Sequence, residues 1–248
     1  MKKIIAMLLT AAMLLSLAAC GNSNTKISEE AFQNSREAFK LVTNAYLDTN
    51  EYSQDIYEAW RLGVNNRKAY DEDNELEDFI DEMHIDGVYI KQAIAKLLFK
   101  ESYEYGDWKR LPYMYNGSYF SAWVSVISEA YVCSGDVEKI SEQLNSAKAL
   151  MKDLGDEYSD YEHYPSLKKY FTNTLAFFDF CQNPEGSFEQ VVETFNAYRN
   201  NAREYFFDLN YVFGDSIGGM DDFVSEGEDS FSESDGTDAA VAEPAPEN

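Results

Sequence analysis

Histidine and cysteine, the residues that most often supply metal ligands and nucleophiles, are scarce in this sequence. The 248 residues contain two histidines, His84 and His163, and three cysteines. The histidines are too far apart to form a pair with zinc-binding spacing, and no HExxH motif occurs. A GxSxG nucleophile motif and a phosphate-binding glycine loop are also missing. The motifs therefore predict no catalytic residue, no metal site and no cofactor.

Basic residues are the second shortage. Twenty Lys and Arg stand against 45 Asp and Glu, which gives a formal net charge of -25. Eleven of the acids and none of the bases lie in residues 215–248. A chain this acidic repels nucleic acid and anionic lipid headgroups, so we expect no nucleic-acid partner. Much of the charge is also explained by the need to keep a surface protein soluble.

Long hydrophobic runs are confined to the N-terminus. Lys2 and Lys3 precede an apolar run over residues 4–19, which is too short for a comfortable membrane span and is typical of a secretory signal. The run ends in Leu17-Ala18-Ala19-Cys20, which resembles the lipobox of bacterial lipoproteins. The resemblance implies cleavage before Cys20, a lipid thioether on its sulfur and acylation, such as palmitoylation, of the new amino group.

The lipobox resemblance also predicts a location. Two or more acyl chains hold a protein at a bilayer, where one chain alone does not. We therefore expect a signal peptide over 1–19, a lipidated tether over 20–27, and localisation at the extracytoplasmic face of the cell membrane. The alternative is an ordinary cleaved signal with an incidental cysteine.

Hydrophobic residues recur at helical spacing through most of the remaining chain, and no segment alternates as a strand does. The pattern predicts an all-α domain over 28–214, an antiparallel bundle of about six helices. Residues 215–248 lack periodicity, and their acidic, serine- and glycine-rich composition predicts a disordered tail. The expected helices cover about 28–64, 73–104, 118–134 and 136–155, one from Pro165 through Cys181, and one that begins at a Ser187–Gln190 capping box and extends through Leu209.

The acidic stretch 71–82 is the nearest approach to a metal motif. It resembles a calcium loop at four positions, but Leu76 stands where the sharp turn requires glycine. We therefore interpret it as the solvated start of a helix, where carboxylates are favoured. His84 is interpreted as a packing residue with one satisfied nitrogen, and His163 as an exposed residue in a linker.

Aromatic residues are abundant, with 18 Tyr and 16 Phe. Most fall on helix stripes and are expected to fill the core. The segment from Trp108 to Tyr115 fits no stripe. Trp108, Tyr113 and Tyr115 are therefore the candidate recognition surface, of a kind that stacks on a sugar or a peptide.

Cys133 and Cys181 remain after Cys20. If the helices over 118–134, 136–155 and 165–182 alternate in direction, both cysteines reach the same end of the bundle and could form a disulfide. The alternative is that each is a small apolar residue in a helix face.

These observations favour a membrane-anchored, non-enzymatic lipoprotein whose helical bundle binds an envelope protein, peptide or glycan. A second hypothesis is a cell-wall or glycan hydrolase, which would need two carboxylates about 5 to 9.5 Å apart in a concave pocket. A solute-binding subunit of an importer fits less well, because such proteins usually have two α/β lobes.

Overall fold

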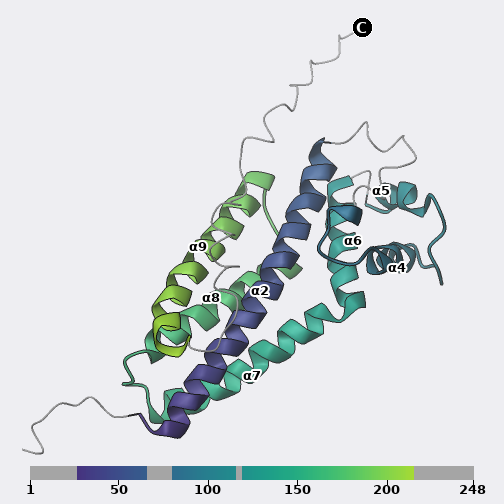
Figure 1. The fold of residues 1–248 in the computed structure, drawn as a ribbon. Helices are drawn as coiled ribbons and strands as arrows, with labels where there is room; N and C mark the ends of the chain where they lie inside the picture. Colours follow the sequence, from purple (N-terminus) through teal and green to yellow (C-terminus); the bar gives the residue numbers. More distant parts are fainter. Residues whose placement is uncertain (1–26, 66–79, 116–118, 215–248) are drawn as a thin grey trace, which may run out of the picture.

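A computed structural model describes residues 27–65, 80–115 and 119–214, and every regular element in these ranges is helical. The all-α class predicted from periodicity is therefore confirmed, and the elements are arranged as shown in Figure 1. The signal peptide, Cys20 and residues 215–248 lie outside the described residues, as does most of the acidic stretch 71–82. The elements are α2 (Glu29–Asn65), α4 (Gly87–Leu97), the 3-10 helix η2 (Asp107–Arg110), α5 (Leu111–Met114), α6 (Tyr119–Ser134), α7 (Asp136–Glu157), α8 (Tyr164–Gln182) and α9 (Phe188–Phe213).

The long helix α2 is the central element of the fold. Phe39, Val42 and Ile56 of its apolar stripe are fully buried. Polar residues of α2 are buried as well, and some of their hydroxyl groups are satisfied by the helix itself. Ser35 and Thr49 donate to carbonyls four residues earlier, at 2.9 and 2.6 Å. Both faces of α2 can therefore be covered by other helices without leaving these hydroxyls unpaired.

Helices α6 and α7 run past α2 in the same direction, which corrects the expected alternation. Three contacts fix the order along α2. The Tyr52 ring lies 4.2 Å from that of Tyr131 at the end of α6, Asp48 pairs with Lys139 at the start of α7, and the Ser28 hydroxyl meets that of Tyr158 just after α7. Positions along α2 thus decrease as the chain proceeds through α6 and α7.

Gly135 makes this arrangement possible. It separates α6 from α7 with a φ of 90°, a left-handed conformation that residues with a Cβ rarely adopt. The two helices therefore continue one another with a bend, antiparallel to α2, instead of forming a hairpin (Figure 1).

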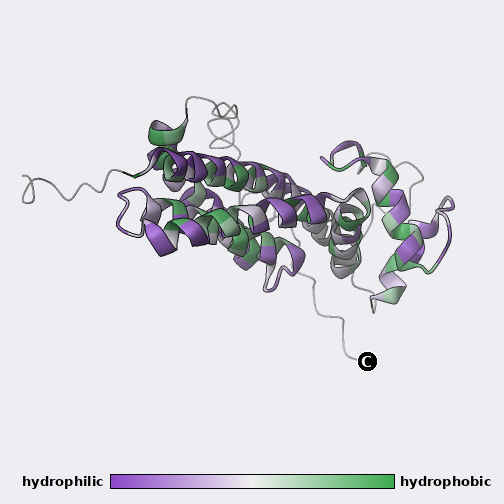
Figure 2. Cartoon of the chain, turned by 90° about the horizontal axis from the view of Figure 1, so that it is seen from below, coloured by the Kyte–Doolittle hydropathy of each residue, from purple (hydrophilic) through white to green (hydrophobic). Residues whose placement is uncertain are grey.

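Helices α8 and α9 form the antiparallel pair on another side of α2. Phe206 and Phe213 of α9 contact Phe39, and Phe188 at the other end of α9 contacts Trp60. The predicted Ser187–Gln190 capping box at the start of α9 is present in full. Figure 2 shows both hydrophobic and hydrophilic residues along the long helices, as expected of helices that bury one face.

The helix expected over 73–104 is wrong in extent. A helical segment ends at Asp81, a connecting segment covers 82–86, and α4 extends only to Leu97. Asp86 caps the new helix by accepting from Val88 N. Gly87 allows a close approach, because a Cβ there would lie 2.3 Å from the Ile80 side chain.

Candidate functional site

A buried carboxylate joins three parts of the fold. The Asp55 side chain has no exposed surface and accepts four hydrogen bonds. Its Oδ1 accepts from the backbone N–H of His84 at 2.8 Å and from His84 Nδ1 at 2.9 Å. Its Oδ2 accepts from Ile85 N at 3.0 Å and from the Tyr131 hydroxyl at 2.9 Å. Four donors match the acceptor capacity of a carboxylate, so α2, the 82–86 segment and α6 are held at one point.

The Asp55–His84 pair has the carboxylate–imidazole arrangement in which a histidine can act as the base for a nucleophile. Donation from Nδ1 to Asp55 leaves the neutral imidazole with its lone pair on Nε2, and the ring is 44% exposed. The hydrogen bond to Asp55 raises the pKa of His84, while partial burial of the ring opposes the rise. The ring's hydrogen-bond partner within the described residues is Asp55 itself. The Asp55 carboxylate thus joins three segments of the fold. His84 Nδ1 is satisfied as predicted, but the exposed ring does not have the packing role expected from the sequence.

Charged groups around His84 come from two helices. Glu51 of α2 lies one turn before Asp55, and burial raises the pKa of its carboxyl. Arg199 of α9, which is 8% exposed, donates from Nε to the Asn50 side chain. The negative charge of Glu51 favours the imidazolium of His84, and the positive charge of Arg199 opposes it.

The structure separates the three aromatic residues of the candidate recognition surface. Trp108 is 3% exposed and its ring lies 6.5 Å from that of Trp123, so it belongs to the core. That part of the prediction is wrong, because η2 turns the indole inward, which loop composition could not show. Tyr113 is 85% exposed and Tyr115 is partly buried against the core.

Other exposed apolar residues lie in the same part of the chain as Tyr113. Large exposed hydrophobic side chains within residues 87–115 are Val88, Phe99, Tyr105, Tyr113 and Met114. An open groove of about 590 Å³ lies in the same region, and its lining includes Val88, Phe99 and Tyr103. We call residues 87–115 the distal end, since they lie far from the start of α2 (Figure 1).

Phe99 is the most unusual residue of the distal end. It is 89% exposed and has a φ of 58°, in the left-handed region that glycine normally occupies. Lys100 N bonds to Ala95 O and Phe99 N bonds to Lys96 O, which is the Schellman pattern that ends a helix. Glycine is the usual residue at this position, so an exposed phenylalanine keeps its ring in water at a cost in backbone strain. Sequence periodicity gave no signal of this, since Phe99 lay inside the expected helix.

The distal end also differs in charge from the rest of the chain. Residues 87–115 contain five Lys or Arg and three Asp or Glu. Lys100 is held by Glu104 and Asp107, and Lys96 pairs with Glu129. The region is therefore slightly basic in a strongly acidic protein.

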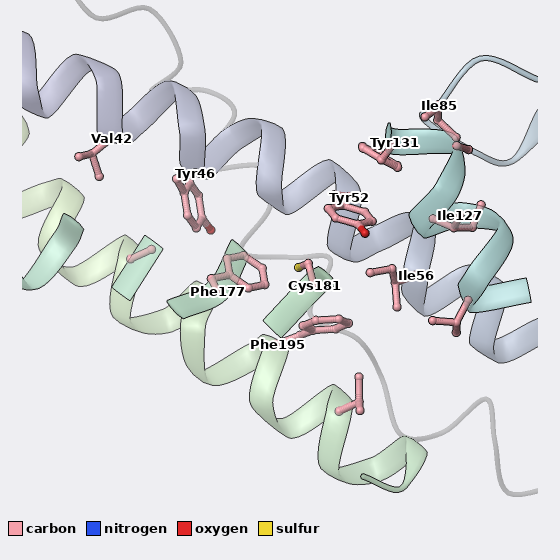
Figure 3. Close-up of a cluster of buried hydrophobic side chains, with 14 of the residues drawn as sticks. Val42, Tyr46, Tyr52, Ile56, Ile85, Ile127, Tyr131, Phe177, Cys181 and Phe195 are labelled. Carbon is pink, nitrogen blue, oxygen red and sulfur yellow. The ribbon is translucent and has the colours of Figure 1, made fainter. Parts of the chain in front are cut away.

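Cys133 and Cys181 are free thiols, so the disulfide considered from the sequence is not formed. Cys133 lies near Glu129 on its own helix, whereas Cys181 faces the Thr49 carbonyl of α2. Figure 3 shows Tyr52 of α2 between Cys181 on α8 and Tyr131 on α6. Because α2 lies between the helices that carry them, the two cysteines cannot meet.

Two further features of the described residues concern metals and membranes. No group of three His, Cys, Asp or Glu side chains in these ranges is arranged to hold a metal ion. None of the helices within them combines the length and the hydropathy needed to span a bilayer.

Comparison with known proteins gives no relative from which to transfer a function. No protein-family model, no curated protein and no solved structure matches this chain.

Proposed function

We propose that this chain is a lipid-anchored extracytoplasmic protein whose helical domain binds an envelope partner through its distal end. The anchor is Cys20, and its support is the lipobox resemblance at the end of the N-terminal apolar run. The partner is an envelope protein, a peptide or a glycan. The observation that carries the binding role is Phe99, an aromatic side chain kept in water in a strained backbone conformation beside an open groove.

The surroundings of Phe99 support this role. Isolated exposed hydrophobic residues are normal on a protein surface, but a concentration of them in one region is typical of an interaction site. Aromatic residues are favoured in such sites because they bury a large area and lose little conformational entropy. At about 1.5 Å per residue, the 37 residues of α2 extend for about 55 Å, which leaves the distal end well separated from an anchor before residue 27.

A hydrolase with a carboxylate pair is less well supported. The groove at the distal end has one carboxylate in its lining, that of Glu101. A second groove, between α8 and α9, has no carboxylate in its lining. Neither arrangement supplies the two convergent carboxylates that glycoside hydrolysis requires.

A site-specific photo-crosslinking experiment in cells tests the binding role. A photoreactive amino acid replaces Tyr113 at the distal end, and in a matched control it replaces Tyr211, which is 96% exposed on α9. We expect a discrete adduct from position 113 that is absent from position 211 and is reduced by Phe99→Ala. Equal adducts from both positions, or an adduct unaffected by Phe99→Ala, would contradict a role for the distal end.

The anchor is tested separately by Cys20→Ala. We expect the protein to move from the membrane fraction to the soluble extracytoplasmic fraction, and to leave the detergent phase on partitioning. A variant that stays in the membrane fraction at full yield would show that the sulfur carries no anchor.

A further inference from the structure

The second groove, between α8 and α9, has a composition that suits an acidic peptide. It has a volume of about 540 Å³ and is lined by one stripe of α8 together with Tyr205 of α9. The stripe consists of Pro165, Lys168, Lys169, Thr172, Asn173 and Ala176. These positions recur every three or four residues, so they form one continuous face of the helix.

Lys168 and Lys169 are the charged residues of this lining, and both are exposed. Within the described ranges neither forms an ion pair, whereas Lys96 and Lys100 of the distal end are both paired with carboxylates. Unpaired cations beside an apolar surface form a site for a segment that carries both carboxylates and an apolar side chain.

The C-terminal end of α9 lies beside the mouth of this groove. The Phe213 ring is 6.1 Å from that of His163, two residues before Pro165. The chain therefore leaves the bundle at Gly214 next to the first turn of α8. The residues that follow are acidic, and Asp221-Asp222-Phe223-Val224 joins two carboxylates to two apolar residues.

We propose that the α8/α9 groove is occupied in cis by the C-terminal segment around residues 221–224. The order of acidic and apolar residues in this segment agrees with the order of charged and apolar residues along the groove. A chain that enters from Gly214 passes Pro165 first, then Lys168 and Lys169, and then the less charged end near Ala176. Asp221 and Asp222 accordingly meet the lysines, and Phe223 and Val224 lie against the apolar part beyond them.

The distances permit this course. Pro165 to Ala176 covers about 16 Å of helix, which about five extended residues match. The six residues between Gly214 and Asp221 make seven Cα–Cα steps, which reach up to about 24 Å when extended and so allow the chain to turn back along α8. A short tether gives an effective concentration in the millimolar range, so a weak individual contact is sufficient. The segment needs no fold of its own to dock as an extended peptide.

Electrostatics also favours this site over the rest of the surface. The chain between Cys20 and Gly214 carries 34 acids and 18 bases, so most of the surface repels an acidic segment. Lys148 and Lys152 of α7 are also exposed and unpaired within the described residues, but they do not line this groove. They provide a control of the same charge.

The test is a photo-crosslink within the full-length mature chain, produced without lipid. Benzoylphenylalanine replaces Phe223, and the adducts are mapped by mass spectrometry. We expect an intramolecular adduct to α8 residues 165–176 or to Tyr205, independent of protein concentration. The double variant Lys168→Glu/Lys169→Glu should lower its yield at least fivefold, whereas Lys148→Glu/Lys152→Glu, with the same change in charge, should leave it within twofold. Raising the salt concentration from about 0.1 to 1 M should weaken the adduct as well.

Three outcomes would overturn the proposal. They are an adduct to another part of the bundle, an adduct that forms only between two chains, and equal losses in the two charge-reversed variants. None of these outcomes bears on the distal end, so this proposal and the proposed function fail separately.

Discussion

The hydroxyl group of Tyr131 donates a hydrogen bond of 2.9 Å to Asp55, although 76 residues separate the two in the chain. The Tyr131 side chain is 4% exposed, and burial raises the pKa of its phenol, so the hydroxyl remains a donor at any physiological pH. The same carboxylate also holds the backbone of His84 and Ile85. This junction is what divides the expected second helix and fixes the 82–86 segment against α2.

We expect Tyr131→Phe to lower the free energy of unfolding by about 1 to 3 kcal/mol, because a buried carboxylate then loses one of its four donors. Urea denaturation monitored by circular dichroism measures the change. Tyr113→Phe is the matched control, and since Tyr113 is 85% exposed its effect should stay within about 0.5 kcal/mol. If the two variants were equally stable, the Tyr131 hydroxyl would not contribute to the junction.

The His84 side chain should make stability depend on pH in a defined direction. Its pKa is raised in the folded protein, chiefly by the hydrogen bond to Asp55. The imidazolium therefore stabilises the fold fully below the unfolded pKa of about 6.5, and this contribution is lost as pH rises through the higher folded value. The effect is modest, since the ring is 44% exposed and screened by solvent.

The corresponding variant is His84→Gln, which keeps the backbone bonds of residues 84 and 85 to Asp55. The stability difference between wild type and variant should be largest near pH 6 and should shrink as pH rises above 6.5. Chemical denaturation at a series of pH values gives this difference. A stability difference between wild type and His84→Gln that grew toward alkaline pH would mean that the folded protein favours the neutral ring over the imidazolium.

The sequence predicted structure correctly where the structure depends on residues that are close together in the chain. The helical periodicity and the Ser187–Gln190 cap are both local features, and both are present. The direction of α6 relative to α7 is not local in this sense. It depends on which surface of α2 each helix covers, and Gly135 is compatible with either a hairpin or a bend.

The Asp55 junction and the exposed Phe99 ring could not be predicted from the sequence, for a different reason. Asp55 is a charged residue on a buried face of α2, and only its partners from α6 and the 82–86 segment explain its burial. Phe99 fits a helical pattern in sequence, but the backbone has already left the helix at Leu98. Interactions between distant segments determine both features, and periodicity contains no information about them.

The two free thiols should react very differently in the native protein. Cys181 is completely buried, which raises the pKa of its thiol well above the usual range, while Cys133 is partly accessible with a less strongly raised pKa. At neutral pH we expect a maleimide to label Cys133 slowly and to label Cys181 only after unfolding. Peptide mapping identifies the labelled site, and Cys133→Ser should abolish native labelling within residues 27–214. Prompt labelling of Cys181 would indicate that α8 opens away from α2.

The last prediction separates backbone strain from binding at Phe99. Because φ is 58° and the ring is 89% exposed, Phe99→Gly relieves strain and removes little packing. We expect it to raise the free energy of unfolding by about 1 kcal/mol, which is less than the full strain because glycine also gains entropy in the unfolded chain. Phe99→Ala is the matched control, since it removes the ring and keeps the left-handed conformation, and it should give no such gain. Both variants should lose the adduct formed from position 113, so a more stable protein would bind its partner less well. A loss of stability in Phe99→Gly would show instead that the ring supports the fold, and the reason for placing binding at the distal end would disappear.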